Sequence, residues 1–214
     1  MTELTFYTNP MSRGRIIRWM LEEVGELYET VLLDYGTTMK APDYLALNPL
    51  GKVPAIRHRD VVVTEGAAIC AYLADTFPNA GLAPPPGHLK RGPYYRWMFF
   101  AAGPVEAAVT NKALEVTFPP EKSAFVGYGS FDAAIDALDL AIRPGPYICG
   151  DQFTAADVYV GSQIGWGMMF GTIPKRPSFE DYFGRLSARP AAIRAREIDD
   201  ALVAEQQQQP GDDA

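Results

Sequence analysis

The sequence contains few of the residues that build disulfide and metal sites. Only two cysteines and two histidines occur among its 214 residues. Cys70 and Cys149 are far apart, form no CxxC pair and match no metal-ligand spacing. We therefore expect reduced cysteines and no metal cofactor.

Long apolar runs and an excess of positive charge are also missing. No run approaches the roughly 18 apolar residues that suggest a membrane span, and residues 1–4 lack the basic and apolar regions of a signal peptide. With 19 basic and 26 acidic side chains, the formal net charge is −7, which argues against binding to nucleic-acid phosphates. We expect a cytoplasmic protein without nucleic-acid or membrane partners.

Hydrophobic residues make up 48% of the chain, which is enough for a sizeable core. Up to about residue 80, strand and helix signals alternate in the order β-α-β-α-β-β-α. The expected strands are 3–8, 28–33, 53–57 and 61–64, and the expected helices are 12–24, 41–47 and 65–77. The first β-α-β unit implies parallel strands, whereas the last two strands are joined by a short turn and are antiparallel.

Strand signals vanish after the prolines at 84–86, which indicate a stiff linker. The expected helices are 94–114, kinked or split by Pro104, and 121–142, 154–170, 178–187 and 191–205. We expect an α/β domain over residues 1–80, an all-α helical bundle over 87–205 and a disordered tail over 206–214. The run Thr154–Asp157 predicts a helical capping box, so we interpret Asp157 as a folding element.

Three segments of the first domain could carry chemistry. Pro54 opens a strand, and a cis bond before it would present the backbone of Val53 to a ligand, although spacing leaves the isomer open. At Glu65 a strand passes directly into a helix, whose first N–H groups favour a carboxylate. The Glu65 side chain could hold an ammonium group, or it could only complement the helix dipole. Ser12 could be an ordinary N-cap, or its hydroxyl could donate to a thiolate.

In this order, and followed by a helical second half, these segments resemble a cytosolic, bacterial-type glutathione S-transferase over about residues 3–200. The run 48–56 resembles the family's cis-proline loop, Glu65-Gly66 its γ-glutamyl-binding Glu-Ser pair and 153–157 the capping box of its core helix. The resemblance implies a thioredoxin-like N-terminal domain, a helical C-terminal domain and a homodimer.

The resemblance also implies where glutathione, as co-substrate, would bind. The implied positions are Lys40, Lys52, Val53, Pro54, Glu65 and Gly66. Val53 would pair its backbone with the cysteinyl part of glutathione, and Glu65 and Gly66 would hold the γ-glutamyl end. Either lysine could neutralise the glycyl carboxylate. Gly66 lacks the family's usual hydroxyl, so only its N–H could serve.

Ser12 lies near the position of the activating Ser, Cys or Tyr residue of the various classes. Aligning the family's activating position by its distance from Tyr7 places it at Ser12. Aligning it by its distance from the segment 21–23, further along the expected helix, places it at Arg13, and Asn9 or Tyr7 itself stay open. Residues 7–15 contain no cysteine, which argues against classes that form a mixed disulfide and against a glutaredoxin.

The implied activity is attack of the glutathione thiolate on a small hydrophobic electrophile, by conjugation or peroxide reduction, in detoxification. The helical domain would contribute the electrophile site, with candidates Tyr94, Trp97, Trp166 and Met169. The glycines of the run 165–171 would weaken a helix, which would suit a segment bent over a ligand. The alternatives are a non-catalytic binding or regulatory protein of the same fold, and a dedicated isomerase or dehalogenase.

Overall fold

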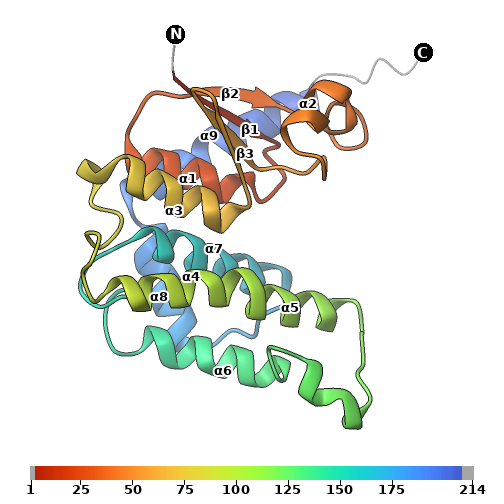
Figure 1. Ribbon diagram of the computed structural model, residues 1–214, viewed down its shortest axis with the longest axis vertical. Helices are drawn as coiled ribbons and strands as arrows, with labels where there is room; N and C mark the ends of the chain where they lie inside the picture. The colour runs from red at the N-terminus through yellow and green to blue at the C-terminus, as the bar shows by residue number, and fades with distance from the viewer. Residues whose placement is uncertain (1–2, 209–214) are drawn as a thin grey trace. The chain divides into compact units, whose positions relative to one another are not determined.

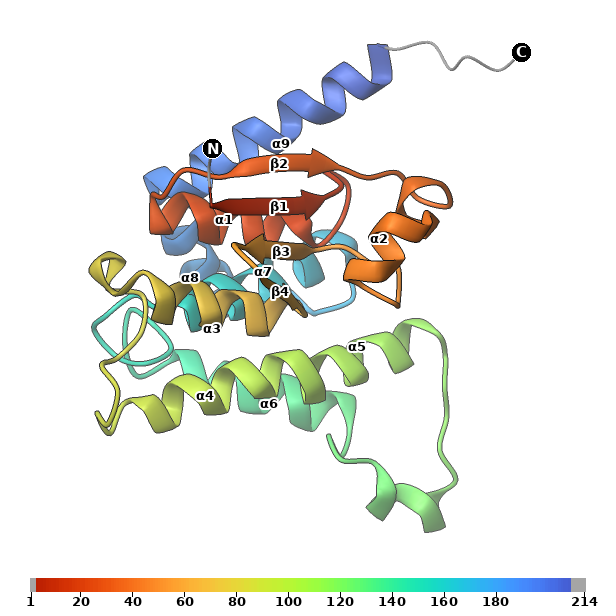
Figure 2. The ribbon, with the colours of Figure 1, turned by 45° about the horizontal axis from the view of Figure 1, so that its top comes forward.

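A computed structural model describes residues 3–208 (Figures 1 and 2). Backbone packing divides the chain into two units, one comprising the first 80 residues and the chain from Arg189 onward, the other comprising Gly81–Ala188. The last helix, α9 (Pro190–Gln208), therefore belongs with the first unit, although its residues up to 205 are expected in the helical domain. Of the expected tail, residues 206–208 are helical, and 209–214 lie outside the described residues.

The first unit is built on a four-stranded mixed sheet with the expected order of elements. Its strands are β1 (Leu4–Thr8), β2 (Glu29–Leu32), β3 (Ala55–His58) and β4 (Val61–Thr64), and its other helices are α1 (Gly14–Val24), α2 (Pro42–Leu47) and α3 (Gly66–Thr76). The spatial order is β2-β1-β3-β4, in which β1 and β2 are parallel and the other pairs antiparallel. The predicted α/β fold of this unit is confirmed by the four-stranded mixed sheet and its helices.

Side chains of β1 alternate between the two faces of the sheet. Phe6 is fully buried, as are Ile17 on α1 and Ile69 on α3. The next side chain, Tyr7, belongs to a second buried cluster that includes Tyr44 of α2. Both faces of the central strand are therefore covered, whereas β2 is an exposed outer strand.

The second unit is helical. Its helices are α4 (Arg91–Phe100), α5 (Glu106–Ala113), α6 (Phe131–Ile142), α7 (Ala155–Phe170) and α8 (Pro177–Ser187). A π-helical turn, Ala101–Val105, contains Pro104 and joins α4 to α5, so the proline widens the helix without ending it. The expected helix 121–142 begins later, at Phe131, because Ser130 caps it by accepting the Ala133 N–H at 3.1 Å.

The capping box at the start of α7 forms as predicted. Its Asp157 carboxylate is fully buried and accepts hydrogen bonds from the Thr154 N–H (2.9 Å) and hydroxyl (3.0 Å). It also accepts the Ile148 N–H at 2.7 Å and the Tyr182 hydroxyl at 2.8 Å. Burial raises the pKa of Asp157 despite these bonds. The carboxylate thus joins α7, α8 and the preceding loop, as a folding element would.

The prediction that glycines bend the segment 165–171 over a ligand is wrong. Helix α7 is continuous up to Phe170, and Gly171 ends it with φ +72°. A Cβ at Gly165 would overlap the Phe183 ring, and one at Gly167 would lie 2.5 Å from a side-chain carbon of Ile173. These glycines allow close packing of neighbouring segments. No helix within residues 3–208 is long and apolar enough to cross a membrane.

Candidate functional site

The strand register brings the three candidate segments to one end of the sheet. Tyr7 near the end of β1 pairs with Ala55 at the start of β3, and Ala55 also pairs with Thr64 at the end of β4. The loop that carries Ser12 follows β1, the Val53–Pro54 bond precedes β3, and Glu65 follows β4. Figure 2 shows that β1 and β2 point towards this end of the sheet, beside α2. Residues distant in sequence therefore converge because of strand direction alone.

The Val53–Pro54 peptide bond is cis. The preceding carbonyl, that of Lys52, accepts the Tyr44 hydroxyl at 2.6 Å and the Asn48 side-chain amide at 2.8 Å. Tyr44 is buried, and this burial raises its pKa to about 12, so the hydroxyl stays a donor. Tyr44 and Asn48 position this loop. Tyr44 was not singled out from the sequence, and Asn48 was included only as the first residue of the run 48–56, without this role.

The two candidate lysines of this loop have different surroundings. The Lys40 ammonium donates to the carbonyls of Leu50 and Gly51, at 3.0 Å each. Gly51 has φ +56°, and a Cβ there would lie 2.8 Å from Lys40 Nζ and 2.6 Å from the Met39 carbonyl. The positive φ and the nearby Met39 carbonyl therefore require glycine at this position. The side chain of Lys52 is exposed.

Glu65 adopts a strained backbone conformation at the start of α3. Its φ is +67° and its ψ is 114°, values that cost a residue with a Cβ about 1–3 kcal/mol. The Glu65 side chain is exposed and makes no capping hydrogen bond to α3. The first N–H groups of α3, beginning with Gly66, have no acceptor inside the helix. A carboxylate and a set of amide donors therefore lie side by side.

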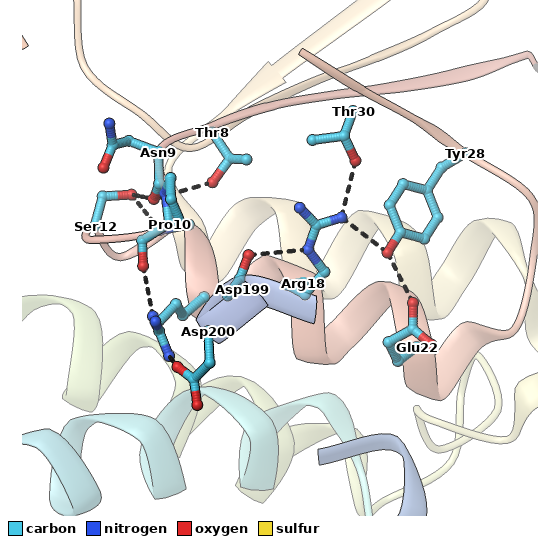
Figure 3. Close-up of polar contacts among 12 residues, drawn as sticks. Thr8, Asn9, Pro10, Ser12, Arg18, Glu22, Tyr28, Thr30, Asp199 and Asp200 are labelled. Atoms are coloured by element: carbon cyan, nitrogen blue, oxygen red, sulfur yellow. Dashed lines mark hydrogen bonds and ion pairs between the residues drawn. The ribbon is translucent and has the colours of Figure 1, made fainter. Parts of the chain in front are cut away.

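Ser12 is buried in the turn between β1 and α1 (Figure 3). Its hydroxyl donates to the Asn9 carbonyl at 2.6 Å and accepts the Gly14 N–H at 2.9 Å. A Cβ at Gly14 would overlap the Thr8 hydroxyl, so the turn requires glycine there. Although Arg13 occupies the N-cap position of α1, the Ser12 oxygen satisfies one of the first helical N–H groups.

Two family models match the chain. The model of the glutathione S-transferase N-terminal domain matches residues 2–75, and that of the C-terminal domain matches residues 106–166. A glutathione transferase from Methylococcus capsulatus shares 30% sequence identity, with a TM-score of 0.76 over 92% of this chain and 99% of its own. The chain belongs to the glutathione S-transferase family.

Other proteins similar to this glutathione S-transferase belong to the same family. Glutathione S-transferase GstA of Escherichia coli O157:H7 is 29% identical over 165 residues, which span 76% of this chain and 78% of that protein. A glutathione transferase homologue from Sulfitobacter, solved with bound glutathione, shares 25% identity, with a TM-score of 0.74 over 92% of this chain and 99% of its own.

The other candidates for thiol activation in this family member have different surroundings. The amide of Asn9 is buried, donating to the Leu33 carbonyl at 2.9 Å and accepting the Met11 N–H at 2.9 Å. The ring of Tyr7 lies 5.8 Å from that of Tyr44 and lines a cavity of about 410 Å³ under α2. The Arg13 side chain is exposed.

The candidate electrophile residues of this transferase fold lie on α4 and α7 of the second unit. Tyr94 is fully buried, with its ring 5.3 Å from that of Tyr95, and is part of the core. Trp97 and Trp166 are half-buried, and Met169 is 68% exposed. Among residues 3–208, no group of three or more His, Cys, Asp or Glu side chains could hold a metal ion.

Charged residues on α1 also pair with α9, which sequence reasoning missed. Arg18 is almost fully buried and bonds Asp199 of α9 at 3.2 Å, Thr30 at 2.8 Å and the Tyr28 hydroxyl at 3.0 Å (Figure 3). Arg15, closer to Ser12, bonds Asp200 at 2.7 Å. The last helix thus packs on the helix that begins at the candidate site.

Proposed function

We propose that the protein binds reduced glutathione at this end of the sheet and activates its thiol for attack on a small hydrophobic electrophile. The observation that carries the proposal is the convergence of Ser12, the cis Val53–Pro54 bond and the Glu65-Gly66 pair, imposed by the strand register. Membership in the glutathione S-transferase family supports it, as does the related Sulfitobacter structure with bound glutathione.

Each part of the tripeptide has a matching group in this proposal. The cysteinyl backbone pairs with the N–H and C=O of Val53, as a short antiparallel strand would. The γ-glutamyl ammonium meets the Glu65 carboxylate, and its carboxylate meets the N–H groups that start at Gly66. Lys52, rather than Lys40, neutralises the glycyl carboxylate, because the Lys40 ammonium already donates to two loop carbonyls.

Thiol activation falls to Ser12 in this proposal. A free thiol has a pKa of about 8.5, so only a few per cent is ionised near neutral pH. A donated hydrogen bond and the N-terminus of α1 both favour the thiolate. The Ser12 hydroxyl must turn its hydrogen away from the Asn9 carbonyl, while its oxygen keeps the Gly14 N–H. A pKa lowered by ~2 units corresponds to roughly 2.7 kcal/mol.

The electrophile would contact the apolar residues of α4 and α7 that are not fully buried, namely Trp97, Trp166 and Met169. Tyr94 would support them from the core. The thiolate then forms a bond to an electrophilic carbon as the leaving group departs. With a peroxide it instead attacks one oxygen as the O–O bond breaks and the alcohol leaves, and a second glutathione converts the resulting sulfenic acid to the disulfide and water. The family resemblance supports a cytoplasmic homodimer that acts in detoxification.

The competing proposal is a non-catalytic binding protein of the same fold. It is favoured by one observation, the donation of the Ser12 hydroxyl to the Asn9 carbonyl. Calorimetric titration with reduced glutathione and with S-hexylglutathione tests both. Saturable binding of both ligands, tighter for the hexyl conjugate, supports the peptide site and an adjoining apolar site. No binding of either ligand at millimolar concentration overturns the proposal of a transferase.

A further inference from the structure

Arg15 connects the last helix of the chain to the turn that carries Ser12. It lies in the first turn of α1, and its Nε donates to the Pro10 carbonyl at 2.5 Å. Its Nη1 donates to the Asp200 carboxylate of α9 at 2.7 Å. The same guanidinium group thus contacts both Pro10 and Asp200. One planar side chain therefore bridges a residue near the C-terminus and a turn near the N-terminus.

Pro10 is a sensitive point in this turn. Proline has no N–H, so its carbonyl is the one backbone group through which hydrogen bonds can hold it. Two residues later, Ser12 makes both of its hydroxyl hydrogen bonds within the same turn, to Asn9 and Gly14. A rotation of the Pro10 peptide plane would therefore change the direction of the Ser12 hydroxyl.

Other ion pairs hold α9 on α1 without touching this turn. At the far end of α1, Arg189 bonds both oxygens of Glu23 at 2.7 and 2.8 Å, and Arg194 bonds Glu22 at 3.3 Å. Loss of the Arg15–Asp200 contact would leave these pairs in place. The contact with the turn can thus be removed separately from the docking of α9.

We propose that Arg15, held in place by Asp200, is a positioning residue that fixes the Pro10 carbonyl and through it the position of the Ser12 oxygen, from which the hydroxyl can turn its hydrogen to the bound thiol. The C-terminal helix is then part of the support of the catalytic turn. This inference rests on the proposed function, because it assigns Ser12 its role toward glutathione.

The substitution Asp200→Asn separates positioning from simple electrostatics. Removal of a carboxylate leaves the surroundings of the thiolate more positive, which by itself lowers the pKa of the bound glutathione thiol. Loss of the contact that orients Arg15 raises the thiol pKa, because the Ser12 hydroxyl then donates to the thiolate less often. We expect the second effect to dominate, so that the thiol pKa rises. Arg15→Lys keeps the charge but loses the planar guanidinium that donates to two acceptors at once, so it should also raise the thiol pKa.

The measurements are the thiolate absorbance of bound glutathione against pH, and kcat and KM with an electrophile that the wild-type protein accepts. We expect both variants to lower kcat about threefold or more while KM for glutathione stays within about twofold. The matched control is Arg194→Gln, which removes an α1–α9 ion pair far from the turn. A thiol pKa that falls or stays unchanged in Asp200→Asn, or an equal effect of the control, overturns the proposal.

Amide hydrogen exchange provides a readout that needs no glutathione. We expect faster exchange at the Ser12 and Gly14 amides in Arg15→Lys and Asp200→Asn than in the wild type and Arg194→Gln. If wild-type protein fails to bind glutathione, the proposed function fails, and the exchange rates still decide whether Arg15 holds the turn. Unchanged rates in both variants overturn the positioning role.

Discussion

Arg18 and Asp199 form an ion pair, 3.2 Å long, in which both side chains are almost completely buried. The guanidinium also lies over the Phe6 ring, 5.0 Å from its centroid. Among the described residues, Arg18 Nη2 and Asp199 Oδ2 make no hydrogen bond. Burial raises the pKa of Asp199 above its usual value, and the neighbouring Arg18 guanidinium only partly offsets this rise. This pair joins α9 to α1. Burial of its two charges is unfavourable, and only their attraction to each other offsets that cost.

Removal of one partner of this ion pair should therefore lower the free energy of unfolding more than removal of both. We expect Asp199→Ala to lower the free energy of unfolding by about 3–5 kcal/mol, because Arg18 is left buried and unpaired. The double variant Arg18→Met/Asp199→Leu should lose less, since it leaves no buried charge. Urea unfolding followed by tryptophan fluorescence, to which Trp19 on α1 contributes, measures both. A double variant less stable than Asp199→Ala would contradict this account of the pair.

Glu65 should show a trade-off between stability and binding. Glu65→Gly removes the strain of φ +67° and should stabilise the protein by about 1 kcal/mol, while glutathione affinity falls at least about tenfold. Glu65→Gln keeps the strain and should weaken binding without a gain in stability. Thermal unfolding and calorimetry together test this. Undiminished affinity in both variants would remove Glu65 from the γ-glutamyl site.

The order of strands and helices was predictable because alternation and helical periodicity are local properties of the chain. The pairing of Arg15 and Arg18 with α9 was not. On a helical wheel these arginines lie outside the apolar stripe, and nothing nearby in sequence shows that they will pair with carboxylates at positions 199 and 200, or that Arg18 will be buried.

The candidate site was predictable to a similar extent. Val53–Pro54 and Glu65 lie in motifs that are continuous in sequence and could be singled out, although spacing left the isomer of the proline bond open. The hydrogen bonds of Ser12 depend on how a short turn closes, and the anchoring of Lys52 by Tyr44 depends on the packing of α2. The glycines of α7 were misinterpreted, because glycine favours both flexibility and close packing.

Two helical glycines of the second unit should respond oppositely to the same substitution. A Cβ at Gly165 would overlap the Phe183 ring, whereas one at Gly184 would meet nothing within 4 Å. We expect Gly165→Ala to destabilise the protein by about 1–3 kcal/mol. Gly184→Ala should stabilise it by about 0.5–1 kcal/mol through helix propensity. Melting temperatures that move in the same direction would count against close packing as the role of Gly165.

Acid should destabilise the second unit through Asp139. Hydrogen bonds from Arg143, then Ser178 and Arg176, lower the pKa of this carboxyl from 3.8 to about 2, although burial opposes them. Because the folded-state pKa is depressed, the stabilisation is complete above pH 3.8 and is lost as the pH falls towards about 2. Unfolding of Asp139→Asn, measured across this range, should depend less steeply on pH. An unchanged slope would show that Asp139 contributes little.

Ser12 offers the most direct test of chemistry at the end of the sheet. Ser12→Ala should raise the pKa of the bound glutathione thiol and lower kcat, while glutathione affinity stays nearly unchanged, because the residues proposed to hold the peptide remain. The same change leaves the buried Gly14 N–H without its acceptor, so we also expect a loss of about 1 kcal/mol in stability.

Ser12→Thr serves as the control, because it keeps a hydroxyl and should retain much of the thiolate signal. Titration of the thiolate absorbance against pH compares the three proteins at saturating glutathione. If Ser12→Ala titrates like the wild type but loses stability, the hydroxyl only caps α1. Thiol activation would then fall to the amides of the α1 N-terminus or to Arg13, the exposed cation next in the chain.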